Sequence, residues 1–179
     1  MREIDVFVLF LPTATLMAGL FGALHDQISY TVSSEYFTKF KFIQFHLLDS
    51  DVPERIRAAK VGFLASWWMG IPLGVLCGSA GFVQRSPALM LRALSWSLPV
   101  ICGFTLTIAI AGLAYGWVQT ATIDPANYQR WFVPRDVTEL RRFLCAGYMH
   151  NSAYLGGALS VPAAWLFHLI FRTLLSSPV

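Results

Sequence analysis

Four long apolar stretches alternate with polar segments along the chain. They cover residues 4–24, 61–83, 96–118 and 143–171. A helix needs roughly 20 mainly apolar residues to cross a membrane, and each stretch is long enough. None alternates between apolar and polar residues as a barrel strand does, so each is predicted to be a helix. We therefore expect an all-α integral membrane protein with a single domain over 1–179, folded as a four-helix transmembrane bundle.

The segment SSEYFTKFKFIQFH, at 33–46, follows the first apolar stretch and predicts a short amphipathic helix. A serine directly before Glu35 is typical of a capped helix start. Lys39 and Lys41 are placed so that their amines can extend toward lipid headgroups. We expect residues 34–48 to form an interfacial helix that covers one end of the bundle. Its apolar stripe is predicted at Tyr36, Phe40, Ile43 and Leu47.

Every apolar stretch contains one proline, a residue that removes a helical hydrogen bond. Kinks are predicted near Pro12, Pro72 and Pro162. Pro99 is instead expected near the start of its helix, where a proline costs little.

Glycines recur at a spacing of four residues in the second and third stretches, which places them on one helix face. They predict close helix packing, either inside the bundle or against a second copy or a membrane-complex partner. The two sets are Gly70, Gly74 and Gly78, and Gly112 and Gly116.

The composition supports a membrane location. Hydrophobic residues make up 56% of the chain and charged residues 13%, against about 25% charged in soluble domains. The net charge of +3 comes from basic residues between the apolar stretches, which argues for a lipid bilayer rather than nucleic acid as partner. Nine of the 13 Lys and Arg lie in the first and third loops. These loops are therefore predicted to be cytoplasmic, in a bacterial inner membrane.

Ionisable residues at membrane depth are the main indication of function. His25 and Asp26 follow the first apolar stretch, and His150 lies inside the fourth. Glu35 and His46 lie in the segment between the first two stretches. Imidazole and carboxylate ligands together suit zinc, iron or manganese. The sequence thus predicts a mononuclear metal site at the membrane edge formed by loops 1 and 3, with redox or hydrolytic chemistry and these five residues as candidate ligands.

Two alternatives remain open from the sequence. His25 and His150 on facing helices are also compatible with a single-haem b-type cytochrome. The glycine faces, together with the absence of a Walker or nucleophile-elbow motif, suit a non-catalytic subunit of a larger membrane assembly. His168 is expected to lie at the opposite membrane surface beside Arg172. Because no carboxylate is expected inside a span beyond the terminal Asp5, an ion-coupled pump is disfavoured.

Overall fold

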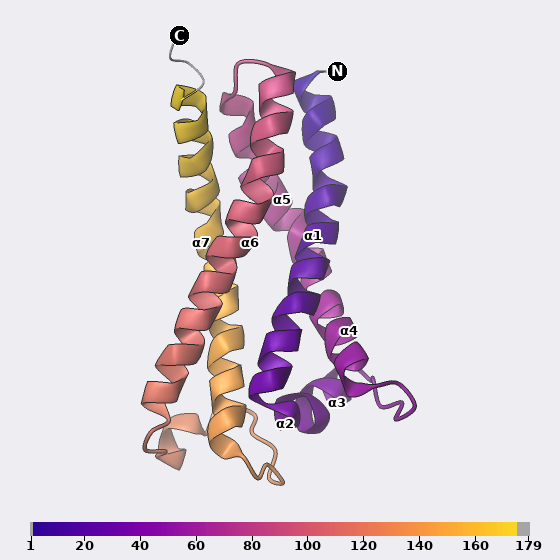
Figure 1. The fold of residues 1–179 in the computed structure, drawn as a ribbon, viewed down its shortest axis with the longest axis vertical. Helices are drawn as coiled ribbons and strands as arrows, with labels where there is room; N and C mark the ends of the chain where they lie inside the picture. The colour runs from indigo at the N-terminus through magenta and orange to yellow at the C-terminus, as the bar shows by residue number, and fades with distance from the viewer. Residues whose placement is uncertain (1, 175–179) are drawn as a thin grey trace.

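The computed structural model describes residues 2–174, which are mostly helical and contain no strand. The helices are joined by short turns, by a loop at 45–53 between α3 and α4, and by a longer loop at 120–139 before the last helix (Figure 1). The elements are α1 (Glu3–Val32), α2 (Ser34–Tyr36), the π-helix η1 (Phe37–Lys41), α3 (Phe42–Gln44), α4 (Glu54–Ser66), η2 (Trp67–Met69), α5 (Gly70–Gly78), η3 (Ser79–Val83), α6 (Pro87–Gln119), η4 (Pro125–Tyr128) and α7 (Leu140–Leu174).

The four long helical runs of the bundle form two pairs. In one pair, α6 packs against α7. In the other, α1 packs against α4 and α5, which belong to a single run. The start of α1 and the end of α7 lie at one end of the molecule, and α2 and α3 lie at the other (Figure 1). The short α2–α3 segment is therefore at the end where α1 finishes and α7 begins.

Four helical runs are long and apolar enough to cross a membrane, which confirms that part of the prediction. They are Glu3–Val32, Glu54–Val83, Pro87–Gln119 and Leu140–Leu174. Each run is longer than its apolar stretch, because the polar residues at the ends contain no helix breaker and continue the helix. α1 accordingly runs past His25 and Asp26 to Val32, and both side chains are buried. The expectation that no carboxylate beyond Asp5 lies inside a span is therefore wrong for Asp26.

The prolines differ in whether the helix continues through them. α1 and α7 continue through Pro12 and Pro162. A 3-10 turn at Trp67–Met69 separates α4 from α5 shortly before Pro72, where the proline removes a helical hydrogen bond. Pro99 lies well inside α6, so the expectation of a nearby helix start was wrong.

The start of α6 is set by a serine and a different proline. The helix begins at Pro87, and the Ser86 hydroxyl oxygen accepts a hydrogen bond from the backbone N–H of Leu89 at 3.3 Å. A proline at the first position of a helix loses no hydrogen bond. The apolar stretch misplaced this boundary because the first turns of α6 carry polar residues such as Arg92.

The glycine faces pack inside the chain. A Cβ atom on Gly70 would lie 2.4 Å from the Cα of Thr15, and one on Gly112 would lie 1.9 Å from the Ser152 Oγ. Gly70 thus lets α5 approach α1, and Gly112 lets α6 approach α7. Association with a partner chain stays a prediction.

The segment from Ser34 to Gln44 is helical but contains a π-turn at Phe37–Lys41. A π-turn adds one residue to the helical turn, so the residues beyond it shift to a different face. Phe42 and Lys41 are buried as a result, whereas Ile43 is 55% exposed. The predicted stripe was therefore wrong at Ile43, and Lys41 does not extend outward.

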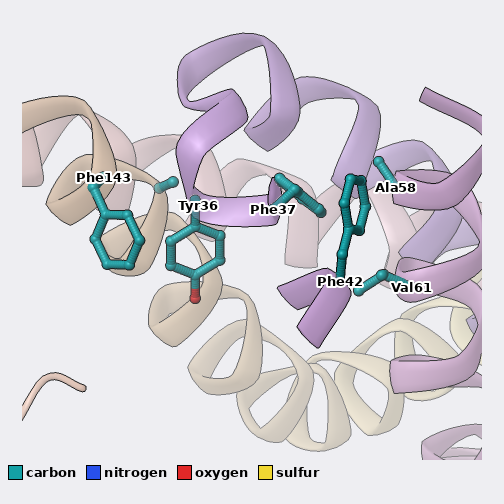
Figure 2. Packing of buried hydrophobic residues seen from close by; sticks show 7 residues of the cluster. Tyr36, Phe37, Phe42, Ala58, Val61 and Phe143 are labelled. Carbon is teal, nitrogen blue, oxygen red and sulfur yellow. The ribbon is translucent and has the colours of Figure 1, made fainter. Parts of the chain in front are cut away.

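The buried rings of this segment connect the two helix pairs (Figure 2). The ring centroids of Tyr36 and of Phe143 in α7 lie 5.1 Å apart. Phe37 and Phe42 belong to the same buried cluster as Ala58 and Val61 of α4. The segment thus covers the end of the bundle, bridging α4 and α7.

The helical segment ends at Gln44, four residues earlier than the predicted limit of 48. His46 adopts a left-handed backbone with φ 55°. Its N–H donates to the Ile43 carbonyl at 3.2 Å, and the Leu47 N–H donates to the Phe42 carbonyl at 2.9 Å. This pair of hydrogen bonds is a Schellman motif, which terminates helices.

Candidate metal centre

Three of the five predicted ligands come together between α1 and α7. His25 and Asp26 are neighbours on α1, and His150 lies on α7. One ligand atom from each residue lies within 4.8 Å of the other two. All three residues are buried, with exposed fractions of 4%, 2% and 8%. Because α7 packs against α1, residues that are distant in the sequence form one cluster.

The contacts within the cluster are polar and close. The Nδ1 atom of His25 lies 3.0 Å from the Oδ1 atom of Asp26. The Nε2 atom of His150 lies 3.7 Å from the same oxygen. The two imidazole rings meet edge to face, with centroids 4.8 Å apart at an angle of 84°. Asp26 thus lies within reach of both imidazoles.

Two polar atoms of the cluster lack a hydrogen-bond partner among the described residues. They are the Nε2 atom of His25 and the Oδ2 atom of Asp26, both buried. An unpaired buried polar group usually costs about 1–3 kcal/mol. Such groups therefore call for an explanation, and a bound ion or ligand is one.

His150 is positioned by groups on three sides. Its Nε2 atom shares a hydrogen bond of 3.1 Å with the Ser29 hydroxyl. The Tyr36 ring stacks on the imidazole with centroids 4.9 Å apart at 29°, and the Phe37 ring lies 6.2 Å away. The α2–η1 segment therefore covers the imidazole, which agrees with its predicted role as a cover.

Glu35 lies in the covering segment, but its carboxylate is engaged elsewhere. It accepts hydrogen bonds from the backbone N–H groups of Thr138 at 3.0 Å and Glu139 at 2.8 Å, just before α7 begins. Lys39 donates to it at 2.6 Å. The Lys39 ammonium and these donors lower the pKa of the Glu35 carboxyl to about 2. The structure therefore gives Glu35 an anchoring role at the start of α7.

His46 lies outside the cluster too. It is exposed, and its left-handed backbone closes the Schellman motif after α3. The structure therefore groups His25, Asp26 and His150, and it places Glu35 and His46 in other contacts.

A cavity of about 140 Å³ adjoins the cluster and is lined by all four long helical runs. His25, Asp26 and His150 lie at its edge, and so does Lys41 from the π-turn. Burial lowers the pKa of the Lys41 amine below its ordinary value. The remaining lining is mostly apolar, with the hydroxyl groups of Ser66 and Thr105 among the exceptions, so the acidic, basic and imidazole side chains of the cavity gather near the cluster.

Sequence reasoning missed the role of Lys41 and Ser29. Lys41 looked like a surface lysine because a regular helix would point it outward, and the π-turn changes that direction. Ser29 carries no motif. The only available signal was its position four residues after His25, one helical turn further along the same face.

A second buried histidine lies away from the cluster. His168 is 0% exposed, and its expected position at the opposite membrane surface stays a prediction. Gln84 donates through Nε2 to the His168 carbonyl at 3.0 Å and lies 3.3 Å from the ring Nδ1. These contacts connect the turn after η3 to α7 and hold the imidazole inside the bundle.

Comparison with known proteins gives no family for this chain: no family model matches it, and neither curated proteins nor solved structures yielded a similar protein.

Proposed function

We propose that this chain is a membrane metalloprotein in which His25, Asp26 and His150 bind one transition-metal ion. The observation that carries the proposal is the meeting of these three ligand groups within 4.8 Å in a buried site. Ligand atoms about 2 Å from a tetrahedral ion lie about 3.3 Å apart. The separations of 3.0 Å and 3.7 Å at Asp26 are close to that value.

The donor set indicates the kind of ion. Two imidazoles and one carboxylate are typical of catalytic zinc and of non-haem iron, and manganese also accepts such ligands. Three protein ligands are fewer than the four of a closed structural zinc site. An ion held here would keep a position for water or a substrate, as redox or hydrolytic chemistry requires.

A single ion suits the geometry better than a haem. A haem ligated by His25 and His150 would have to lie between their two rings. The ring centroids are only 4.8 Å apart and meet edge to face. In addition, the Oδ1 atom of Asp26 lies 3.7 Å from the Nε2 atom of His150. This arrangement favours a small cation shared by the three residues.

Elemental analysis of the purified full-length protein tests the proposal. We expect about one zinc, iron or manganese ion per chain in the wild type, and its loss in His150→Ala. His46→Ala is the matched control, because His46 is exposed and outside the cluster. Asp26→Asn provides a second variant that changes little volume. Near-zero metal in the wild type, or equal metal in wild type, His150→Ala and Asp26→Asn, would contradict the proposal.

The membrane orientation is part of the same proposal. We infer that loops 1 and 3 face the cytoplasm, because most Lys and Arg residues lie there. Single cysteines at Asp51 in loop 1 and Arg85 in the loop between α5 and α6 test this, since both positions are exposed. In intact cells, a membrane-impermeant maleimide should label the Arg85→Cys variant and not the Asp51→Cys variant. The reverse pattern would contradict the orientation.

A further inference from the structure

The acidic, basic and imidazole side chains that line the cavity beside the candidate metal centre lie at one end of it. His25, Asp26, Lys41 and His150 line that end, and the α1 wall continues as far as Phe10. At 1.5 Å of rise per residue, the α1 wall from Asp26 to Phe10 extends about 24 Å. The cavity therefore combines a compact polar site with a long and mainly apolar wall, the pattern that suits an amphiphile with a single chain.

Lys41 brings a cationic side chain to the polar end, where the buried Asp26 carboxylate attracts it electrostatically but forms no direct ion pair with it among the described residues. Its Nζ atom donates to the Gln44 side-chain oxygen at 3.0 Å. The same atom lies 4.8 Å from the Phe40 ring centroid and 5.7 Å from that of Tyr36. A buried ammonium is costly unless an anion balances it. An anionic head group on the ligand would form the direct ion pair with Lys41 that Asp26 does not form.

One lining residue of the cavity, Tyr154, is also 58% exposed on the surface of the bundle. Tyr154 lies on α7, one of the helices apolar enough to cross a membrane. An entry beside Tyr154 would lie where lipid chains surround the protein, so a molecule dissolved in the bilayer could reach the cavity there.

We propose that the cavity binds one long-chain fatty acid, with its carboxylate beside Lys41 and its hydrocarbon chain in the apolar part. The inference rests on the proposed function in one respect, since the carboxylate would also balance a metal ion at the adjacent centre. The space of about 140 Å³ is too small for the two chains of a phospholipid and would enclose the part of one chain next to the carboxylate. The far end of the chain would extend into the surrounding lipid.

Photolabelling of the full-length protein in zwitterionic nanodiscs tests this inference. The probe is palmitic acid with a diazirine on its chain, and unlabelled palmitic acid competes with it. We expect saturable labelling of cavity-lining residues. Lys41→Met should weaken competition by palmitic acid about tenfold, because one charge-assisted contact is lost. The same change should leave competition by cetyl alcohol, which has the same chain and no carboxylate, unaltered.

Cavity-filling variants separate chain binding from head-group binding. Ala153 and Ala18 line the cavity, whereas Ala114 is exposed on α6 and does not. Ala153→Leu and Ala18→Leu should each reduce labelling severalfold, and Ala114→Leu should match the wild type. Labelling that does not saturate, that maps outside the cavity, or that is equal in Lys41→Met and wild type would overturn the inference.

Metal content measured on the same samples keeps the two proposals distinct. A wild type that contains metal and shows no saturable labelling would overturn the fatty-acid site alone. Saturable, Lys41-dependent labelling of a protein that contains no metal would overturn the metal centre alone.

Discussion

Glu35 in the covering segment accepts a hydrogen bond of 2.8 Å from the backbone N–H of Glu139, directly before the first residue of α7. The same carboxylate accepts the Thr138 N–H at 3.0 Å and the Thr138 hydroxyl at 2.7 Å. The first N–H groups of a helix have no partner within the helix, and a negative charge near them is stabilising. Glu35 therefore caps α7 from a distant part of the chain and holds the cover against it.

Glu35→Gln should loosen the start of α7 and lower the free energy of unfolding by about 1–2 kcal/mol. The glutamine keeps the shape but loses the charge that faces Lys39 and the helix end. Faster amide exchange at Thr138 and Glu139, with a lower melting temperature, would show the effect. Glu139→Gln is the control, because Glu139 forms only an exposed ion pair of 3.5 Å with Arg142. Equal exchange in both variants would contradict the capping role.

Acid should remove the same stabilisation. The Lys39 ammonium and the α7 donors lower the folded-state pKa of Glu35 from 4.5 to about 2. A carboxyl with a lowered folded-state pKa stabilises the fold fully above its unfolded-state pKa, and this contribution is lost as the pH falls toward the folded-state value. The difference in melting temperature between wild type and Glu35→Gln should therefore shrink between pH of about 5 and about 2. A difference that stays constant over this range would argue against the assignment.

The helices were predictable from the sequence because their signal is long and local. Four stretches of the length needed to cross a membrane determine element type and approximate place, whatever the neighbours do. The boundaries were less predictable, since His25 to Val32 is polar enough to resemble a loop and is nevertheless helical. A polar turn continues a helix when the surrounding helices bury it, and that information lies in tertiary contacts.

The covering segment shows where local reasoning fails. Its helical character and its caps could be predicted, but the π-turn at Phe37–Lys41 could not, because no residue type specifies it. One inserted residue then buried Lys41 and exposed Ile43. By contrast, His25, Asp26 and His150 were among the five candidate ligands from the sequence, since ionisable residues in or next to a membrane span are rare, and their role as ligands stays a prediction.

Close helix contact at glycine can be tested with two matched alanine substitutions. A Cβ on Gly62 would lie 2.1 Å from the Gly22 carbonyl oxygen of α1, whereas one on Gly103 would meet nothing within 4 Å. Gly62→Ala should destabilise the fold by about 1–3 kcal/mol or more, because backbone must move. Gly103→Ala should be neutral or stabilising by up to about 1 kcal/mol. Thermal unfolding in detergent measures both, and similar melting temperatures for the two variants would contradict the close approach of α4 to α1.

Metal binding should stabilise the folded protein if His25, Asp26 and His150 form the proposed centre. A ligand that binds only the folded state adds about 2.7 kcal/mol at a concentration of 100 times its Kd. The melting temperature of chelator-treated protein should therefore rise when zinc, iron or manganese is added back. His25→Ala should abolish that rise.

His168→Gln is the stricter control, because it removes another buried histidine and lies outside the cluster. It should lower the starting melting temperature while keeping the metal-dependent rise. A rise that persists in His25→Ala, or that disappears in His168→Gln, would mean that the ion binds elsewhere.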